Sequence, residues 1–308
     1  MNRDNILKEL SQYGRVEFNS PLSDHTTFKT GGNADILINP YTEDSIAHII
    51  PVIKNEHIPI HIIGGGSNLL ISDKGLRGVT IKISGSENSF NIAAGYIYAG
   101  ASLGKEQFIS SAINEGFGGV EFMAGIPGTI GGGIFMNAGT YMGSFSDIIK
   151  KIRLLNDNCS IVEVAIDELT SGYRTMTIPE NNIIIGGYFS LPKTDDSLEI
   201  KNRIDSIIRD RWEKHPMDYP SAGSVFKNPK SYSSWKLIND SGLKGYRIGG
   251  AEISEKHTNF IINRDNAASS DIYNLIKYIQ EKVYSHSGIR LETEIKMMGE
   301  FQEELPSS

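Results

Sequence analysis

The chain has 308 residues, of which 39% are hydrophobic and 22% charged, and its formal net charge is −7. This composition is ordinary for a globular protein and excludes collagen-like, coiled-coil and disordered chains. A mildly acidic chain lacks the basic surface of a nucleic-acid-binding protein. A length of 308 residues predicts two or three domains.

The chain has a single cysteine, Cys159, so no intramolecular disulfide can form and a reducing compartment is favoured. The first five residues mix charges and precede no long apolar stretch, so we expect no signal peptide. No stretch approaches the ~18 apolar residues of a membrane span. We therefore expect a cytoplasmic protein with neither a membrane nor a nucleic-acid partner.

The first third of the chain alternates helix-like and strand-like stretches. We expect a helix over 6–13, a strand over 34–39, a helix over 42–56, and strands over 59–63 and 79–83. Thr42 is the expected cap of the second helix, and Pro51 should kink or split it.

The remainder of the chain continues this alternation. It predicts a hairpin about Gly95, a helix over 103–114, a glycine-dense stretch over 118–139, paired strands 148–155 and 161–165 around Cys159, a strand 183–191, a helix 198–214, a helix 233–239, a strand 258–262, a helix 270–285 and a strand 290–298. The pattern places domain boundaries near Ser84 and near His215.

Two glycine clusters stand out among the 32 glycines. The first is Gly64–Asn68, directly after a predicted strand, and the second is Gly125–Gly133, followed by Asn137-Ala138-Gly139. Glycine lets backbone N–H groups approach a ligand closely, and converging N–H groups bind phosphate oxygens. Either cluster alone could simply form turns, but two of them favour a ligand with an extended diphosphate, such as a dinucleotide.

Better-known motifs are missing. The first cluster lacks the third glycine of G-x-G-x-x-G, and Gly104-Lys105 is followed by Glu106 where a P-loop needs Ser or Thr. His57 and His61 have zincin-like spacing, but Pro59 lies between them and the pattern is that of a strand, so we expect no metal site. No G-x-S-x-G of a serine hydrolase occurs.

Three polar residues could carry chemistry, although spacing alone favours plainer interpretations. Ser224 lies in a stiff loop between two prolines and is most simply a turn serine. Glu294 lies with Glu292 on one face of an alternating strand, which is typical of a solvated sheet face. Arg174 is either an anion clamp or a surface arginine.

Several longer motifs extend over most of the chain. They are HTTFKTGG at 25–32, IGGGSNLL at 63–70, AGIPGTIGG at 124–132, MNAG at 136–139, SAGSVFKNP at 221–229, GLKG at 242–245, IGGA at 248–251, KHTNFI at 256–261 and LETE at 291–294. In this order they resemble the UDP-N-acetylenolpyruvoylglucosamine reductase family, also called UDP-N-acetylmuramate dehydrogenase, of bacterial cell-wall peptidoglycan synthesis. The resemblance extends from about residue 25 to residue 299.

The resemblance implies an α+β fold, made of a two-subdomain FAD-binding fold of the vanillyl-alcohol-oxidase (PCMH) type and a C-terminal α/β substrate domain. The implied domains are 1–84, 85–214 and 215–308, and the last strand could return to the first of these. Non-covalent FAD would be held by Gly64, Gly65, Gly66, Ser67, Asn68, Gly125, Pro127, Gly128, Thr129, Gly131, Gly132, Asn137, Ala138 and Gly139.

The resemblance also implies catalytic roles for Arg174, Ser224 and Glu294. Substrate contacts would come from Tyr173, Lys214, Lys227 and Asn228. Where the family usually has Asp or Asn and then Ser after Tyr173-Arg174, this chain has Thr175-Met176. The short span from Arg174 to Lys214 resembles the branch of the family that lacks an inserted tyrosine loop.

The implied activity is NADPH-dependent reduction of UDP-N-acetylglucosamine enolpyruvate to UDP-N-acetylmuramate by a monomer. One alternative is another FAD oxidoreductase on the same scaffold, such as an alcohol oxidase, because a fold does not fix a function. A second alternative is a non-catalytic protein that binds flavin or a sugar nucleotide.

Overall fold

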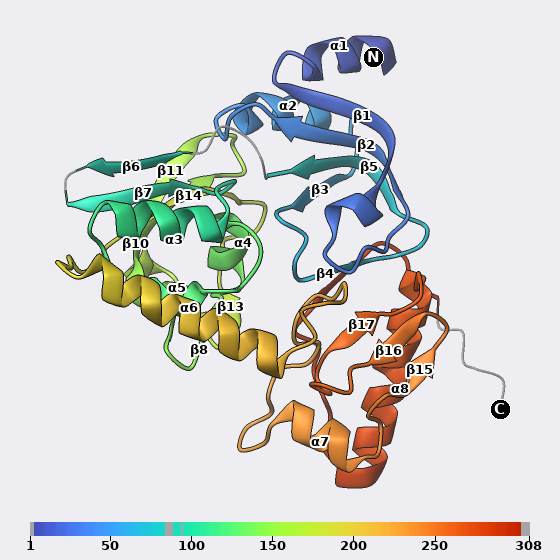
Figure 1. The fold of residues 1–308 in the computed structure, drawn as a ribbon. Coiled ribbons are helices and arrows are strands. Elements are labelled where there is room, and N and C mark those ends of the chain that lie inside the picture. Colours follow the sequence, from blue (N-terminus) through green and yellow to red (C-terminus); the bar gives the residue numbers. More distant parts are fainter. Residues whose placement is uncertain (1–2, 84–88, 94, 303–308) are drawn as a thin grey trace. The chain divides into compact units, whose positions relative to one another are not determined.

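The computed structural model describes residues 3–83, 89–93 and 95–302 (Figure 1). The chain divides into two compact units that are discontinuous in sequence. Unit 1 comprises Met1–Phe18, Ile36–Gly65 and Gly78–Asp210, and unit 2 comprises Asn19–Asp35, Gly66–Arg77 and Arg211–Ser308. The predicted boundary at Ser84 lies outside the described residues, and the three-domain division stays a prediction.

A four-stranded sheet with the order β1-β2-β5-β3 opens the chain. Its strands are β1 (Gly14–Pro21), β2 (Asn33–Pro40), β3 (Ile60–Ile63) and β5 (Leu76–Lys82), and β3 runs parallel to β5. The helices α1 (Arg3–Leu10) and α2 (Ile46–Asn55) belong to unit 1. Residues Gly64-Gly65 follow directly after β3, as predicted.

The second sheet of unit 1 is antiparallel, with the order β11-β10-β14-β7-β6. Its strands are β6 (Phe90–Ala93), β7 (Tyr96–Gly100), β10 (Ile149–Leu155), β11 (Ile161–Ala165) and β14 (Ile183–Phe189). Unit 1 also contains the helices α3 (Lys105–Asn114), α4 (Ile130–Phe135) and α5 (Phe145–Ile148). Two hairpins with strands of two residues each belong to it as well: β8 (Gly139–Thr140) with β9 (Gly143–Ser144), and β12 (Ser171–Gly172) with β13 (Thr175–Met176). Phe108, Phe145 and Phe189 meet in its core, with ring centroids 5.0 and 6.1 Å apart along that chain of contacts.

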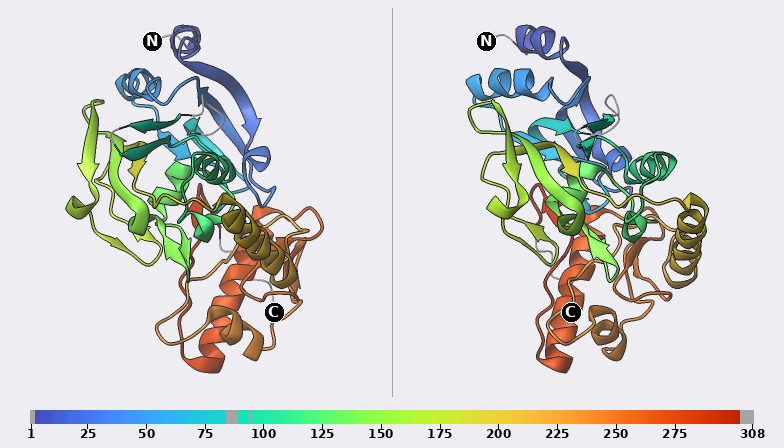
Figure 2. Two further views of the ribbon diagram at one scale, coloured as in Figure 1. Left: turned by 60° about the vertical axis from the view of Figure 1, so that its left-hand side comes forward. Right: turned by 90° about the vertical axis from the view of Figure 1, so that its left-hand side faces the viewer.

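Unit 2 is built on the small antiparallel sheet β15-β16-β17 and the long helix α8 (Ser269–Ser287) packed beside it (Figure 1, Figure 2). The strands are β15 (Arg247–Ile248), β16 (Ala251–Ile253) and β17 (Ile261–Asn263), and a shorter helix, α7 (Ser234–Asp240), also contacts α8. The parallel pair β4 (Leu69–Ile71) and β18 (Lys296–Met298) adds residues from the first third of the chain to this unit. The 18-residue helix α6 (Ser197–Lys214) leads into it.

Most predicted elements are confirmed, including the hairpin about Gly95 and the paired strands about Cys159, which has a φ of 58° and a free thiol. The helix over 42–56 is wrong in two details. It begins only at Ile46, and Pro51 leaves it unbroken. A proline inside a helix removes one hydrogen bond and clashes with the preceding turn, at a cost of about 3 kcal/mol. Burial of four isoleucines on this helix more than offsets that cost.

The expected strand over 290–298 is also wrong in its extent, because only Lys296–Met298 forms a strand. Before it, Thr293 makes an isolated bridge to Phe226. The side chains therefore do not alternate regularly: Glu292 is exposed, whereas Glu294 is half-buried.

No helix was predicted in the glycine-dense stretch 118–139, yet residues Ile130–Phe135 within it form α4. The Thr129 hydroxyl accepts a hydrogen bond from the N–H of Gly132 and caps this helix. Gly131 lies against Ala101 and Gly133 against the ring of Phe145, so glycine is required here for close packing.

We predict that Gly133→Ala destabilises the protein. Alanine normally favours a helix over glycine by about 1 kcal/mol. An added Cβ here would lie 2.6 Å from Phe145 Cε2, and Phe145 is fully buried, so overpacking of about 1–3 kcal/mol wins. Thermal unfolding should show a lower midpoint than wild type. Gly104→Ala is the matched control, since its Cβ would meet nothing within 4 Å; equal midpoints for the two variants would contradict the packing argument.

Candidate functional site

The two glycine clusters touch within unit 1. A Cβ on Gly64 would lie 2.9 Å from Thr129 Oγ1, and a Cβ on Gly65 would lie 2.8 Å from Gly128 Cα. A real Cβ atom does not tolerate the distance to the Gly128 backbone, so position 65 requires glycine, and at position 64 the buried Thr129 side chain would have to move. The sequence predicted two clusters, and the structure brings them into direct contact.

The backbone donors of this contact fit a diphosphate. Within the described part of the chain, the N–H groups of Gly64, Gly65, Gly128 and Thr129 make no hydrogen bond to a protein acceptor. Thr129 is 6% exposed, and buried N–H groups are nearly always paired in folded proteins. A ligand with several anionic oxygens would supply the missing acceptors.

The rest of the second cluster has mixed surroundings. Gly132 and Pro127 are exposed, whereas Gly125 and Ala138 are half-buried. The carboxamide of Asn137 is bonded inside the protein at both ends: Nδ2 donates to Gly172 O at 3.0 Å, and Oδ1 accepts from Ser146 N at 2.9 Å. Asn137 therefore fixes the neighbouring hairpin through its side chain.

Arg174 lies at the tip of that hairpin, between β12 and β13, with a φ of 59°. Its Nη1 donates to Gly139 O at 2.7 Å, and its guanidinium carbon lies 5.3 Å from the centre of the Tyr173 ring. The sequence-predicted Arg174 and Gly139 are thus direct neighbours. Met176, where the family usually has a polar residue, is buried in the core of unit 1.

Ser224 and Glu294 lie on neighbouring segments of unit 2. Ser224 forms a bridge to Phe260 on one side, and on the other side Phe226 forms a bridge to Thr293. The Glu294 N–H donates to Val225 O at 2.7 Å, next to Ser224 in the chain. The structure therefore brings these two predicted catalytic residues together in unit 2, while Arg174 belongs to unit 1.

Asn68, the last residue of the first glycine cluster, holds Glu294 from the other side. Its Nδ2 donates to Glu294 O at 3.1 Å, and its own carbonyl accepts from Lys296 N at 2.9 Å. Both main-chain groups of Glu294 are therefore bonded. Gly66 in the same segment has a φ of 67° and lies tightly against the His25 backbone, while Ser67 is half-buried.

Asn259 is a positioning residue that sequence reasoning missed. Its side chain accepts from Phe226 N at 3.0 Å and donates to Phe226 O at 2.8 Å, and its carbonyl accepts from Val225 N at 2.8 Å. Together these bonds fix the backbone beside Ser224. The available signal was an amide side chain just before the apolar run Phe260-Ile261-Ile262.

The predicted substrate-contacting residues of unit 2 have protein partners. Lys227 Nζ lies 3.5 Å from Glu292 Oε2, at the surface. The Asn228 side chain accepts from Ser234 N at 2.9 Å, at the start of α7. Lys214 is exposed at the end of α6.

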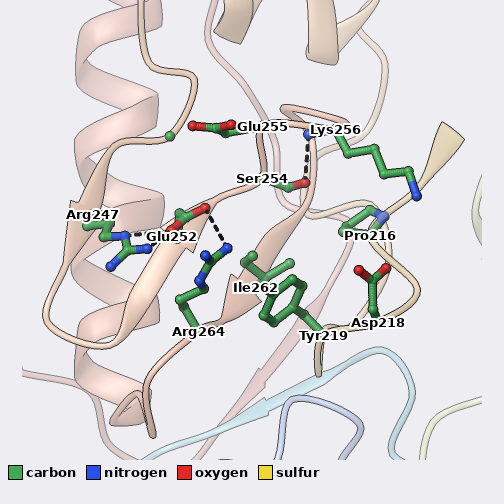
Figure 3. A pocket seen from close by; sticks show the side chains of 11 residues that line it. Pro216, Asp218, Tyr219, Arg247, Glu252, Ser254, Glu255, Lys256, Ile262 and Arg264 are labelled. Atoms are coloured by element: carbon green, nitrogen blue, oxygen red, sulfur yellow. Dashed lines mark hydrogen bonds and ion pairs between the residues drawn. The ribbon is translucent and has the colours of Figure 1, made fainter.

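A separate cavity of about 270 Å³ lies in unit 2 (Figure 3). Arg247 and Arg264 both point toward the buried carboxylate of Glu252, and Arg264 also lies over the Tyr219 ring at 4.8 Å. Arg247 also lies 3.6 Å from Asp265 Oδ2, so the two guanidinium groups are matched by two carboxylates. None of the sequence-predicted site residues lines this cavity.

Two imidazoles lie close to the Ser224 segment. The rings of His215 and His257 are 5.1 Å apart, and both lie near the ring of Phe260, the bridge partner of Ser224. Burial, and to a smaller extent the neighbouring His215, lower the pKa of His257 to about 4. His257 Nδ1 is buried and has no hydrogen-bond partner in the described chain.

Among the described residues there is no group of His, Cys, Asp and Glu side chains that could hold a metal ion. In that same part of the chain, no helix combines the length and apolar character needed to span a bilayer.

Comparisons with known proteins give a consistent result. Residues 34–165 match the FAD binding domain family, and residues 215–298 match the family described as UDP-N-acetylenolpyruvoylglucosamine reductase, C-terminal domain. The UDP-N-acetylenolpyruvoylglucosamine reductase of Caldanaerobacter subterraneus subsp. tengcongensis is 42% identical over 96% of this chain and 97% of its own. The protein of the same name from Clostridium botulinum (strain Alaska E43 / Type E3) is 37% identical over the same shares.

A solved structure is similar over nearly the whole chain. The crystal structure of UDP-N-acetylenolpyruvylglucosamine reductase from Thermus caldophilus has a TM-score of 0.80 at 30% sequence identity. The similarity covers 93% of this chain and 100% of that one.

We predict that His257 makes the protein less stable in acid. Its folded-state pKa of about 4 lies below the unfolded value of about 6.5, so the unfolded chain takes up the proton first. Stability contributed by neutral His257 is therefore complete above pH 6.5 and is lost as the pH falls toward 4. Thermal midpoints at fixed FAD concentration should fall more steeply between pH 7 and 4.5 for wild type than for His257→Gln. Parallel curves would contradict this assignment.

Proposed function

Because the chain belongs to the UDP-N-acetylenolpyruvoylglucosamine reductase family, we propose that it reduces UDP-N-acetylglucosamine enolpyruvate to UDP-N-acetylmuramate, with NADPH as the reductant. The observation that carries this proposal is the 42% identity over 96% of the chain. It is supported by the pairing of the Ser224 and Glu294 segments within one unit.

The FAD of this family would be held by the two glycine clusters. Gly64, Gly65, Gly128 and Thr129 present N–H groups that make no bond to a protein acceptor in the described chain, which fits the diphosphate. The remaining predicted cofactor residues, Gly66, Ser67, Asn68, Gly125, Pro127, Gly131, Gly132, Asn137, Ala138 and Gly139, would shape or line the same site. When bound, FAD supplies the hydride chemistry.

Ser224 would supply the proton of the reaction. Reduction of the enolpyruvyl double bond adds a hydride equivalent to one carbon and a proton to the other. A hydroxyl is a weak acid in water, but the carbanion-like centre is a strong base, so a serine held within hydrogen-bond reach can protonate it. The role is supported by the backbone around Ser224: Ser224 bridges Phe260, and Asn259 binds the N–H groups of the next two residues, Val225 and Phe226.

Arg174 and Glu294 would stabilise the negative charge that develops next to the substrate carboxylate. A guanidinium is always cationic and binds carboxylates in a forked geometry. Glu294 would act as a neutral donor. Fixed positions support both roles: Arg174 is bonded to Gly139, and the Glu294 backbone is bonded at both its N–H and its carbonyl.

Tyr173, Lys214, Lys227 and Asn228 would contact the UDP-sugar. Tyr173 is 55% exposed and carries a large aromatic surface next to Arg174. Lys227 would exchange its surface partner Glu292 for a substrate oxygen, which is a small cost because exposed ion pairs contribute about 0–1 kcal/mol.

We further infer the organisation in which this activity operates. FAD-binding subdomains at 1–84 and 85–214 and a substrate domain at 215–308 are supported by the family matches at 34–165 and 215–298. A cytoplasmic location is supported by the single cysteine, which allows no intramolecular disulfide, and we infer that the protein acts as a monomer.

The purified full-length protein tests the proposal directly. It should be yellow, lose its colour with NADPH under anaerobic conditions, and regain it on addition of the enolpyruvyl UDP-sugar. Bleaching by an alcohol in place of NADPH, with recolouring by oxygen and none by the UDP-sugar, would favour the alcohol-oxidase alternative. Colour that NADPH cannot bleach would favour a non-catalytic flavin-binding protein.

We predict that Ser224→Ala separates the two half-reactions. Reduction of the bound flavin by NADPH should keep its wild-type rate, whereas reoxidation by the UDP-sugar should slow by about 10²–10⁴-fold, the usual size of a general-acid effect. Stopped-flow absorbance measures both. Ser221→Ala, in the same loop, is the matched control; a loss below tenfold, or equal losses in both half-reactions, would exclude the proton-donor role.

We predict a similar split for Glu294→Ala and none for Glu292→Ala. The two glutamates are two residues apart, but Glu292 is exposed and paired with Lys227, whereas Glu294 is half-buried beside the Ser224 segment. Reoxidation by substrate should slow at least about tenfold in Glu294→Ala, a lower bound on the electrostatic effects measured for transition-state donors. The same stopped-flow assay applies, and equal rates in both variants would contradict the role of Glu294.

A further inference from the structure

Lys105 is a buried basic residue next to the second glycine cluster, and none of the roles described so far includes it. It is the first residue of α3 and only 5% exposed. Its Nζ donates to Pro127 O at 3.0 Å, and its backbone N–H donates to Gly128 O at 3.0 Å. One residue therefore binds two consecutive carbonyls of the loop.

These two bonds determine which way the loop's N–H groups point. A trans peptide directs its C=O and the following N–H to opposite sides, and the described chain contains no cis peptide bond. With Pro127 O and Gly128 O directed at Lys105, the N–H groups of Gly128 and Thr129 are directed away from it. The bond from Ile130 N to Leu103 O, 2.8 Å long, completes the same pairing at the next residue.

The N–H groups directed away are the ones that make no bond to a protein acceptor in the described residues. They lie where Gly64 and Gly65 contact Gly128 and Thr129. If the peptides turned over, the loop would present carbonyl oxygens there, which repel a phosphate. The Lys105 amino group opposes a turn of the Pro127–Gly128 peptide, because a buried amino group that loses the Pro127 acceptor carries a desolvation penalty.

We propose that Lys105 is a positioning residue for FAD: by binding the Pro127 and Gly128 carbonyls, it orients the loop so that its N–H groups face the cofactor's diphosphate. This inference rests on the proposed role of the second glycine cluster in holding FAD. Lys105 acts through the loop and stays behind it.

The test compares FAD binding to full-length apoprotein by flavin fluorescence. Lys105→Met keeps the length of the side chain and removes its donor. We expect its FAD dissociation constant to rise about 10- to 100-fold, the size typical of a buried hydrogen bond to a charged group. At saturating FAD the visible spectrum should match that of wild type, because the loop peptides and not the isoalloxazine surroundings have changed. Lys151→Met, at an exposed lysine of β10 in the same unit, is the control.

Lys105→Gln and Lys105→Arg keep a donor and should bind FAD more tightly than Lys105→Met. Thermal midpoints of the apoproteins show whether each variant is folded. A dissociation constant for Lys105→Met within threefold of wild type would overturn the inference, and so would equal weakening in all three variants, which would assign the effect to packing. If wild-type apoprotein does not bind FAD, the proposed function fails instead.

Discussion

The close approach of two backbones in unit 1 is the constraint from which the candidate cofactor site follows. Gly65 lies so near Gly128 that a Cβ at position 65 would lie 2.8 Å from Gly128 Cα, which leaves no room for a side chain there. Because no side chain lies between the two segments, main-chain N–H groups of both can donate to a ligand at the place where the segments meet. Backbone donors in fixed peptides need no reorientation when an anion binds. The glycines are thus explained by packing and by ligand chemistry together, and the sequence pattern alone could not separate these two reasons.

A second constraint acts on Glu294. A glutamate side chain is flexible, so its usefulness in catalysis depends on how well its backbone is fixed. Here the N–H is bonded to the chain beside Ser224, and the carbonyl is bonded to the side chain of Asn68. The parallel pairing of β18 on β4 starts directly after these bonds and fixes the register of the segment. Asn259 does the same for Ser224 through three hydrogen bonds to its neighbours. The two predicted catalytic residues of unit 2 are therefore held by amide side chains that take no part in the proposed chemistry.

The sequence was informative where local rules act alone. Glycine after a predicted strand located the first cluster, and turn residues around Cys159 located a hairpin. It was misleading where tertiary packing decides, as at Pro51, which lies inside an intact helix because four isoleucines are buried on it. Helix α4 was missed because three consecutive glycines indicate a loop, whereas in the structure two of them fit against Ala101 and Phe145. The roles of Ser224, Glu294 and Arg174 came from family resemblance, since spacing favoured plainer readings for each.

Lys105 is a residue that neither local sequence rules nor the family resemblance identified. It lies more than twenty positions before the loop carbonyls that it binds, and no local pattern distinguishes a buried lysine from a solvated one at the start of a helix. Most lysines are exposed, so the sequence favours solvent for this one too. Only the coordinates of the two carbonyls reveal that its donors act on consecutive peptides. A residue that orients peptides leaves no chemical signature of its own, because the groups presented to the ligand belong to its neighbours. The structure reveals such a residue as the hydrogen-bond donor to the C=O of a peptide whose N–H has no protein acceptor.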